Sequence, residues 1–201
     1  MIKEFEFFNP FAESTLLFTA YVDLDHDAIA KWMRRKLNGH RDYTSYFNSE
    51  FNSMMANEMP MVGDLLRAIE SAATLYAKTR WMDLKSFEGQ RPDIWFSQYL
   101  KGDRHTIHNH PRAMIAGTYY PYADENSCEI RYRHPAHGLL EMAEPWMDRK
   151  PDDVTHTIFK LKPKTGMLNL WPSWMDHEIG PQGPVDADKS RLAISFNYGK
   201  M

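Results

Sequence analysis

Hydrophobic positions change their spacing along the chain, which predicts helices in the first part and strands in the rest. A helix is expected after Asp25, a suitable N-cap, with Asn38-Gly39 as its stop. A second helix is expected after Pro60, and a short strand over 16–21 precedes both. The apolar stripes are Ile29, Trp32, Met33 and Leu37 in the first helix, and Val62, Leu65, Leu66, Ile69, Ala72, Ala73 and Tyr76 in the second. We expect both stripes to pack against the core.

From Asp93 onward the pattern changes to short β-prone runs separated by turn residues. Strands are expected over 94–100, 105–110, 113–120, 127–132, 155–161, 166–171, 176–179 and 190–198. The connection 133–154 would be an insert at the mouth of a barrel. This order favours an α+β fold, a double-stranded β-helix (a cupin-like jelly roll) with N-terminal helices packed on one sheet.

The length of 201 residues predicts one domain. Within this single domain, 1–201, we expect a helical N-terminal portion over 1–90 and a jelly-roll core over 91–201 that carries the functional site.

Composition and charge exclude several classes of protein. Hydrophobic residues make up 43% and charged residues 25%, as in a globular protein, and the formal charge of −3 argues against nucleic acid as a partner. No apolar run is long enough for a membrane span or a signal peptide. The single cysteine, Cys128, excludes multi-cysteine metal sites and favours a reducing compartment. We therefore expect a cytoplasmic protein, and the sequence leaves its oligomeric state open.

The histidines carry the candidate chemistry. In a strand, His108 and His110 would point to the same face, about 7 Å apart, so that both imidazoles could reach one metal ion. His177 could supply a third ligand from another strand, and three histidines suit divalent iron, zinc, manganese or nickel. His105 is an alternative ligand, with His110 then outside the metal's ligand set, but positions 105 and 108 point to opposite faces of a regular strand. We therefore prefer His108 and His110.

Two short patterns are similar to the two cupin half-motifs. They consist of Gly102, His108 and His110, and of Gly166, Pro172 and His177. The glutamate ligand that a cupin would carry near Met114 or Ile115 is missing. The patterns therefore support a jelly roll but argue against a four-ligand cupin site.

A second resemblance covers about half of the chain, from Asp93 to Gly199. This stretch resembles the iron(II) and 2-oxoglutarate-dependent oxygenase superfamily, in particular its branch with a His-x-His-Pro motif and a prolyl-hydroxylase-like jelly roll. The matching pieces are His108-Asn109-His110-Pro111, Gly117-Thr118-Tyr119-Tyr120, the run from Gly166 to Trp174 with His177, and the run from Arg191 to Asn197.

The resemblance implies a role for each site residue. His108, His110 and His177 would hold Fe(II), and Arg191, which lies 14 residues after His177, would bind the distal carboxylate of 2-oxoglutarate. Tyr99 and Tyr120 match the tyrosines near that carboxylate. Most of the superfamily has an aspartate or glutamate at the position of His110, so this site would be less anionic than usual. We expect weaker iron(II) binding or a different metal preference.

The leading functional hypothesis is a mononuclear non-haem Fe(II), 2-oxoglutarate-dependent dioxygenase, a hydroxylase that uses dioxygen and acts on an unidentified small molecule or peptide. The catalytic set would be His108, His110, His177 and Arg191. The first alternative is a cupin-like metal dioxygenase or isomerase that does not use 2-oxoglutarate. The second is a non-enzymatic jelly-roll binding module. We assign Trp171 and Trp174, which flank Pro172, to packing.

Overall fold

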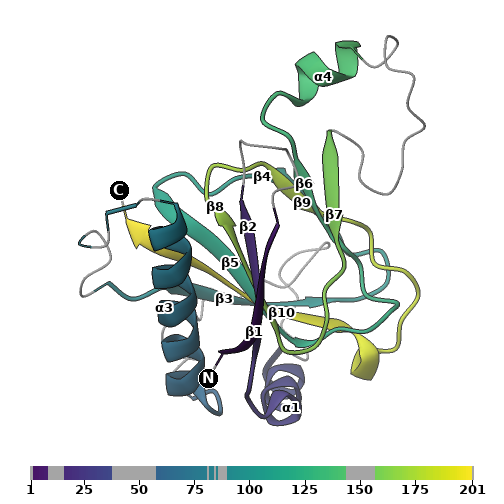
Figure 1. Cartoon of the computed structure of the whole chain (residues 1–201). Coiled ribbons are helices and arrows are strands. Elements are labelled where there is room, and N and C mark those ends of the chain that lie inside the picture. The colour runs from purple at the N-terminus through teal and green to yellow at the C-terminus, as the bar shows by residue number, and fades with distance from the viewer. Residues whose placement is uncertain are drawn as a thin grey trace.

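Two β-sheets face each other, and two helices cover the outer side of the larger sheet (Figure 1). The structure is a computed structural model, and it describes residues 2–8, 16–37, 58–80, 82–83, 85, 90–143 and 157–200.

The strands of the two sheets pair antiparallel throughout the described residues. The larger sheet has the order β1-β2-β8-β5-β10-β3, and the smaller has the order β4-β9-β6-β7. The bounds are β1 Ile2–Phe8, β2 Leu17–Val22, β3 Asp93–Tyr99, β4 His105–His108, β5 Ala113–Tyr122, β6 Ile130–Arg133, β7 Ile158–Leu161, β8 Met167–Pro172, β9 His177–Ile179 and β10 Arg191–Lys200. All eight strands predicted after Asp93 are confirmed, with ends shifted by a few residues.

The helices begin where the sequence predicts. Helix α1 spans His26–Leu37, and the Asp25 carboxylate caps it by accepting a hydrogen bond of 2.9 Å from the Ala28 backbone N–H. Helix α3 spans Val62–Thr79, directly after Pro60. The stop predicted at 38–39 lies outside the described residues.

Strands β1 and β2 show that the N-terminal portion is not only helical. Strand β2 pairs with β8, and β1 pairs with β2, so that both extend the larger sheet. The sequence predicted β2 but not β1. The division of the chain at residue 90 into a helical portion and a core stays a prediction.

Both faces of the larger sheet are covered, so successive residues of one strand serve different layers. Leu168 and Leu170 pack with the helices, whereas Trp171 packs between the two sheets. In β5, Tyr119 belongs to the apolar cluster that the two helices form with the larger sheet, which we call the helix layer. Its hydroxyl lies 2.6 Å from the Nδ1 atom of His26 in α1. Tyr120 belongs to the opposite side.

The predicted insert after β6 contains a short helix, α4, over His137–Ala143. Figure 1 shows that α4 projects beyond the end of the smaller sheet. Residues 144–156, which hold the rest of the insert, lie outside the described residues. A single 3-10 turn over Ala187–Lys189 precedes β10. No helix in the described part of the chain has the length and apolar character that crossing a bilayer requires.

Gly117 lies in β5, between the paired strands β10 and β8, and has no room for a side chain. A Cβ atom there would stand 2.3 Å from Cζ of Phe196 and 2.9 Å from the backbone oxygen of Asn169. We predict that Gly117→Ala lowers the free energy of unfolding by about 1–3 kcal/mol, because overpacking forces neighbours out of place.

Urea unfolding followed by circular dichroism measures this change. Gly138→Ala is the matched control, since a Cβ at position 138 on α4 meets nothing within 4 Å. Equal losses of stability in the two variants would contradict the close approach at Gly117.

Candidate metal and co-substrate site

Three histidines from the two strands β4 and β9 and the turn after β4 meet in the structure. His108 ends β4, His177 begins β9, and the two residues face each other directly in the antiparallel register. His110 lies two residues beyond β4, where its backbone N–H donates a hydrogen bond of 2.8 Å to the carbonyl oxygen of Ser173. The candidate ligand atoms of the three side chains all lie within 4.8 Å of one another. The three histidines chosen from the sequence therefore converge, although His110 is not part of the strand as predicted.

Backbone carbonyls orient two of the three rings. The Nδ1 atom of His108 lies 2.8 Å from the oxygen of Thr106, and that of His177 lies 2.9 Å from the oxygen of Met175. A carbonyl oxygen only accepts, so Nδ1 carries the hydrogen in both rings and the lone pair is on Nε2. Metal-binding histidines are commonly oriented in this way.

The spacing of the nitrogens fits a shared metal ion. The Nε2 atoms of His110 and His177 are 3.2 Å apart. Two ligands at about 2.1 Å from one ion, with an angle near 90–110° between them, have nitrogens about 3.0–3.4 Å apart. The separation of this pair therefore fits two nitrogens that bind one divalent transition metal.

His105 lies closer to the cluster than strand alternation predicts. Its ring stacks on that of His108, with 3.9 Å between the centroids, and both residues line the same cavity. The argument that positions 105 and 108 face opposite ways is therefore wrong. The pairing of β4 with β9 shifts register between the two residues, and such an irregularity breaks the two-residue alternation.

Burial keeps these histidines in the neutral form that a metal requires. Burial, followed by the nearby His108, lowers the pKa of His110 to about 4, and burial also lowers the pKa of His108. The pKa of His177 is well below its usual value for the same primary reason. Burial, together with its histidine neighbours, lowers the pKa of His105 to about 3.

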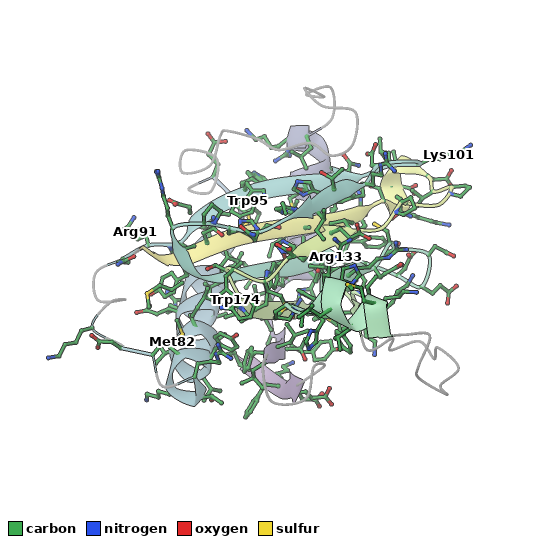
Figure 2. All side chains as sticks on the ribbon, turned by 90° about the horizontal axis from the view of Figure 1, so that it is seen from above. Met82, Arg91, Trp95, Lys101, Arg133 and Trp174 are labelled. Carbon is green, nitrogen blue, oxygen red and sulfur yellow. The ribbon has the colours of Figure 1, made fainter. Side chains whose placement is uncertain are left out.

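Aromatic rings pack against two of the three candidate ligand histidines. Trp95 stacks on His110 with 5.5 Å between ring centroids, and Trp171 meets His177 edge to face at 4.9 Å. Trp95 is on β3, which Figure 2 shows running across the molecule between the labelled Arg91 and Lys101. Trp174, by contrast, is 48% exposed and lines a second cavity, which it shares with His110 but not with His108 or His177.

Arg191 is buried beside the predicted tyrosines. Its side chain is 1% exposed, and the carbon at the centre of its guanidinium group lies 4.5 Å from the ring centre of Tyr99. One terminal nitrogen, NH2, is 3.5 Å from the Tyr120 hydroxyl, and the other, NH1, is 3.6 Å from the sulfur of Cys128. The two tyrosines named from the sequence thus lie next to Arg191, and their role at a co-substrate stays a prediction.

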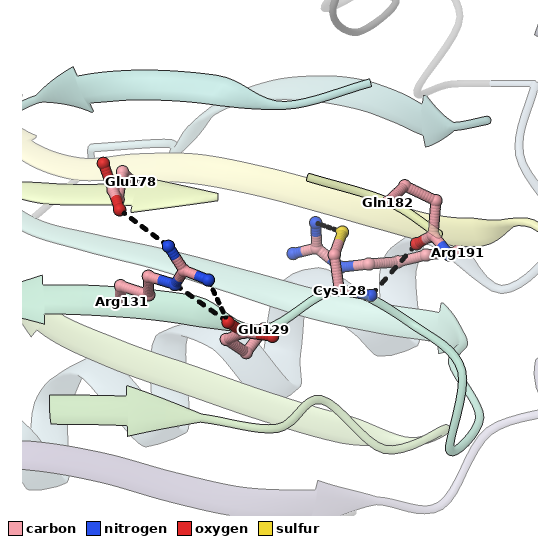
Figure 3. A network of polar contacts seen from close by, with 6 residues as sticks. All are labelled: Cys128, Glu129, Arg131, Glu178, Gln182 and Arg191. Carbon is pink, nitrogen blue, oxygen red and sulfur yellow. Dashed lines mark hydrogen bonds and ion pairs between the residues drawn. The ribbon is translucent and has the colours of Figure 1, made fainter. Parts of the chain in front are cut away.

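Two neighbouring arginines in Figure 3 differ in their partners. Arg131 has carboxylates from Glu129 at 2.6 Å and Glu178 at 3.3 Å. For Arg191, none of the Asp or Glu side chains in the described ranges forms an ion pair, and its Nε is buried without a hydrogen-bond partner. A buried charge without a counter-ion is unfavourable. Arg191 is therefore suited to receive an anion from outside the chain.

Arg191 and the histidine cluster belong to the same cavity. His108, His110, His177, Tyr99 and Arg191 all line it, between the two sheets. The three histidines and the guanidinium therefore border one common space between the sheets.

Residues 93–197 match the family model described as "Putative 2OG-Fe(II) oxygenase". This match spans more than half of the chain, which therefore belongs to the 2OG-Fe(II) oxygenase family. The resemblance found in the sequence is confirmed at this level, as is the assignment to the enzymes that use Fe(II) and 2-oxoglutarate. Among proteins of curated function, none matches this chain.

Solved structures of the same fold include a prolyl-4-hydroxylase from Pseudomonas putida, with 14% identity and a TM-score of 0.57, covering 92% of this chain and 88% of that one. HygX from Streptomyces hygroscopicus, solved with nickel and 2-oxoglutarate bound, has 12% identity and a TM-score of 0.52, with coverages of 92% and 83%. SnoK, a non-haem alpha-ketoglutarate-dependent carbocyclase from nogalamycin biosynthesis, has 10% identity and a TM-score of 0.56, with coverages of 90% and 79%. These likenesses confirm the predicted jelly-roll fold.

The lowered pKa values predict how the stability of the metal-free protein depends on pH. The pKa of a histidine is about 6.5 in the unfolded chain, whereas that of His110 is about 4 in the folded protein. Between these values the unfolded state binds more protons, so the free energy of unfolding falls as the pH is lowered from 6.5 to 4. Each such histidine contributes a slope of up to about 1.4 kcal/mol per pH unit.

Denaturant titrations between pH 7 and pH 4.5 measure this slope, with His110→Gln as the comparison. We expect a shallower slope for the variant, because glutamine does not titrate. Identical slopes would mean that His110 is protonated as easily in the folded protein as in the unfolded chain.

Proposed function

We propose that this enzyme hydroxylates a C–H bond of a small molecule or peptide, with Fe(II) held by His108, His110 and His177 and 2-oxoglutarate held by Arg191. The observation that carries the assignment of these residues is the buried guanidinium of Arg191, which has no carboxylate partner in the described chain and shares one cavity with three convergent imidazoles. The nickel and 2-oxoglutarate bound to the structurally similar HygX are consistent with this assignment.

The roles of the side chains follow from their chemistry. The three neutral imidazoles of His108, His110 and His177 would hold the metal ion. The planar guanidinium of Arg191 can bind a carboxylate through two parallel hydrogen bonds. Tyr99 and Tyr120 both pack against the guanidinium and would hold it in place, and Tyr99 also lines the cavity.

When bound, iron and 2-oxoglutarate supply the oxidising power, because oxidative decarboxylation of the co-substrate to succinate and carbon dioxide activates dioxygen. The chain itself positions these reactants and excludes water from them. Trp95 and Trp171 pack on the ligand histidines and help to exclude water from the metal position. We further propose a cytoplasmic enzyme, on the basis of its single, buried cysteine.

Loss of the guanidinium tests the co-substrate site. We predict that Arg191→Ala weakens the affinity for 2-oxoglutarate at least 10-fold and leaves iron(II) affinity unchanged, because hydrogen bonds to a charged group are lost at one end of the cavity only. An anaerobic titration of the iron-loaded protein, followed by the visible metal-to-ligand charge-transfer band, measures both steps.

Arg131→Ala is the control, because Arg131 does not line the cavity. Circular dichroism confirms that each variant is folded. Iron binding without a charge-transfer band in the unmodified protein would favour the cupin-like alternative, in which 2-oxoglutarate is not used.

The three-histidine site makes a separate prediction. Exchange of the neutral imidazole of His110 for a carboxylate adds a negative charge beside a dication, so we expect His110→Asp to keep or strengthen iron(II) retention. His177→Ala, which removes the most buried of the three rings, should abolish retention and turnover. Iron content after gel filtration measures retention. A severe loss of iron in His110→Asp together with full retention in His177→Ala would overturn the ligand assignment.

A further inference from the structure

Trp171 is a buried polar residue that the assignments above use only for packing. It lies on β8, is 2% exposed, and its indole nitrogen Nε1 has no hydrogen-bond partner among the residues that the structure describes. Buried N–H groups are nearly always hydrogen-bonded in folded proteins. The N–H of Trp171 is therefore expected to have a partner that is not part of the described chain.

Trp171 is held in the cavity of the candidate site. Its ring meets His177 at 4.9 Å and Tyr132 at 5.5 Å between centroids, both edge to face. It lines the same cavity as His177 and Arg191. With two aromatic neighbours in edge-to-face contact, the indole has little freedom to turn its N–H toward another acceptor.

Two buried hydrogen-bond donors belong to side chains that line the cavity. Trp171 Nε1 and Arg191 Nε are both buried donors without a partner in the described residues, and both side chains line the cavity. Asn169, the residue of β8 that has a buried acceptor without a partner, does not line it. The ligand that fits such a cavity is rich in acceptor oxygens and negatively charged, as a dicarboxylate is.

We propose that Trp171 is a co-substrate-binding residue whose indole N–H donates a hydrogen bond to an oxygen of 2-oxoglutarate. This inference rests on the proposed function, since it takes 2-oxoglutarate to occupy the cavity between the histidines and Arg191. It gives Trp171 a direct contact with the co-substrate in addition to its packing against His177.

The indole proton reports this contact directly. The protein is labelled with nitrogen-15 and loaded with Zn(II), which is diamagnetic, and its six tryptophan indole signals are followed during titration with 2-oxoglutarate. The signal of Trp171 is the one that disappears in Trp171→Phe. If this variant does not fold, triple-resonance experiments assign the signal instead. We expect a saturable downfield shift of the Trp171 indole proton.

Calorimetric titration of 2-oxoglutarate into the Zn(II)-loaded variants provides the second readout. We expect about 10-fold weaker affinity for Trp171→Phe, the size of effect typical of one hydrogen bond to a charged group, with unchanged Zn(II) affinity. Trp32→Phe is the matched control, because Trp32 is a buried tryptophan of α1 that packs against Phe96 on the helix side of the larger sheet, outside the cavity, and should leave both affinities unchanged.

The outcomes separate this inference from the proposed function. If 2-oxoglutarate binds and shifts other signals while the Trp171 indole proton does not move, and Trp171→Phe binds as tightly as Trp32→Phe, the role of Trp171 is overturned and the proposed function stands. If 2-oxoglutarate does not bind to the unmodified metal-loaded protein, the proposed function fails, and the inference fails with it.

Discussion

The covering of both faces of the larger sheet is the constraint on which the rest of the structure depends. A strand covered on both sides must supply apolar residues to the helices and a different set of residues to the space between the sheets. In β10, Ile194 and Phe196 belong to the helix layer, whereas Arg191 and Ser195 line the cavity. The same backbone that anchors the core therefore positions the chemistry, and a shift of one residue in its pairing would exchange the two sets.

The smaller sheet supplies the other half of the site through a single strand pairing. Because β4 and β9 run antiparallel with His108 opposite His177, two imidazoles face each other at the end of the pair. The turn that follows β4 is tied to the segment after β8 by the bond from the His110 N–H to Ser173, and this bond brings in the third ring. The site therefore needs both sheets, since the histidines come from one and Arg191 from the other.

Much of the fold could be predicted from the sequence, because helices and buried strands leave different apolar spacings. Strand β1 could not be predicted, since its residues 3–6 are exposed and only its pairing with β2 defines it. The convergence of His108, His110 and His177 could be predicted from motif spacing. The position of His105 could not be predicted, because it depends on a local register shift that the residue types do not indicate. The unpartnered N–H of Trp171 could not be predicted either, since only the folded structure shows which acceptors lie near a donor.

The sequence separation of His110 and His177 has a consequence for folding. His110 and His177 are 67 residues apart in the chain, and the strands β5 to β8 lie between them. A metal ion bound to both closes this long loop as a crosslink would, and loop closure restricts the unfolded chain most when the loop is long. Metal that binds the folded state more tightly than the unfolded chain raises stability by mass action. An ion held by the proposed ligands would thus also crosslink the first and last thirds of the jelly-roll core over 91–201.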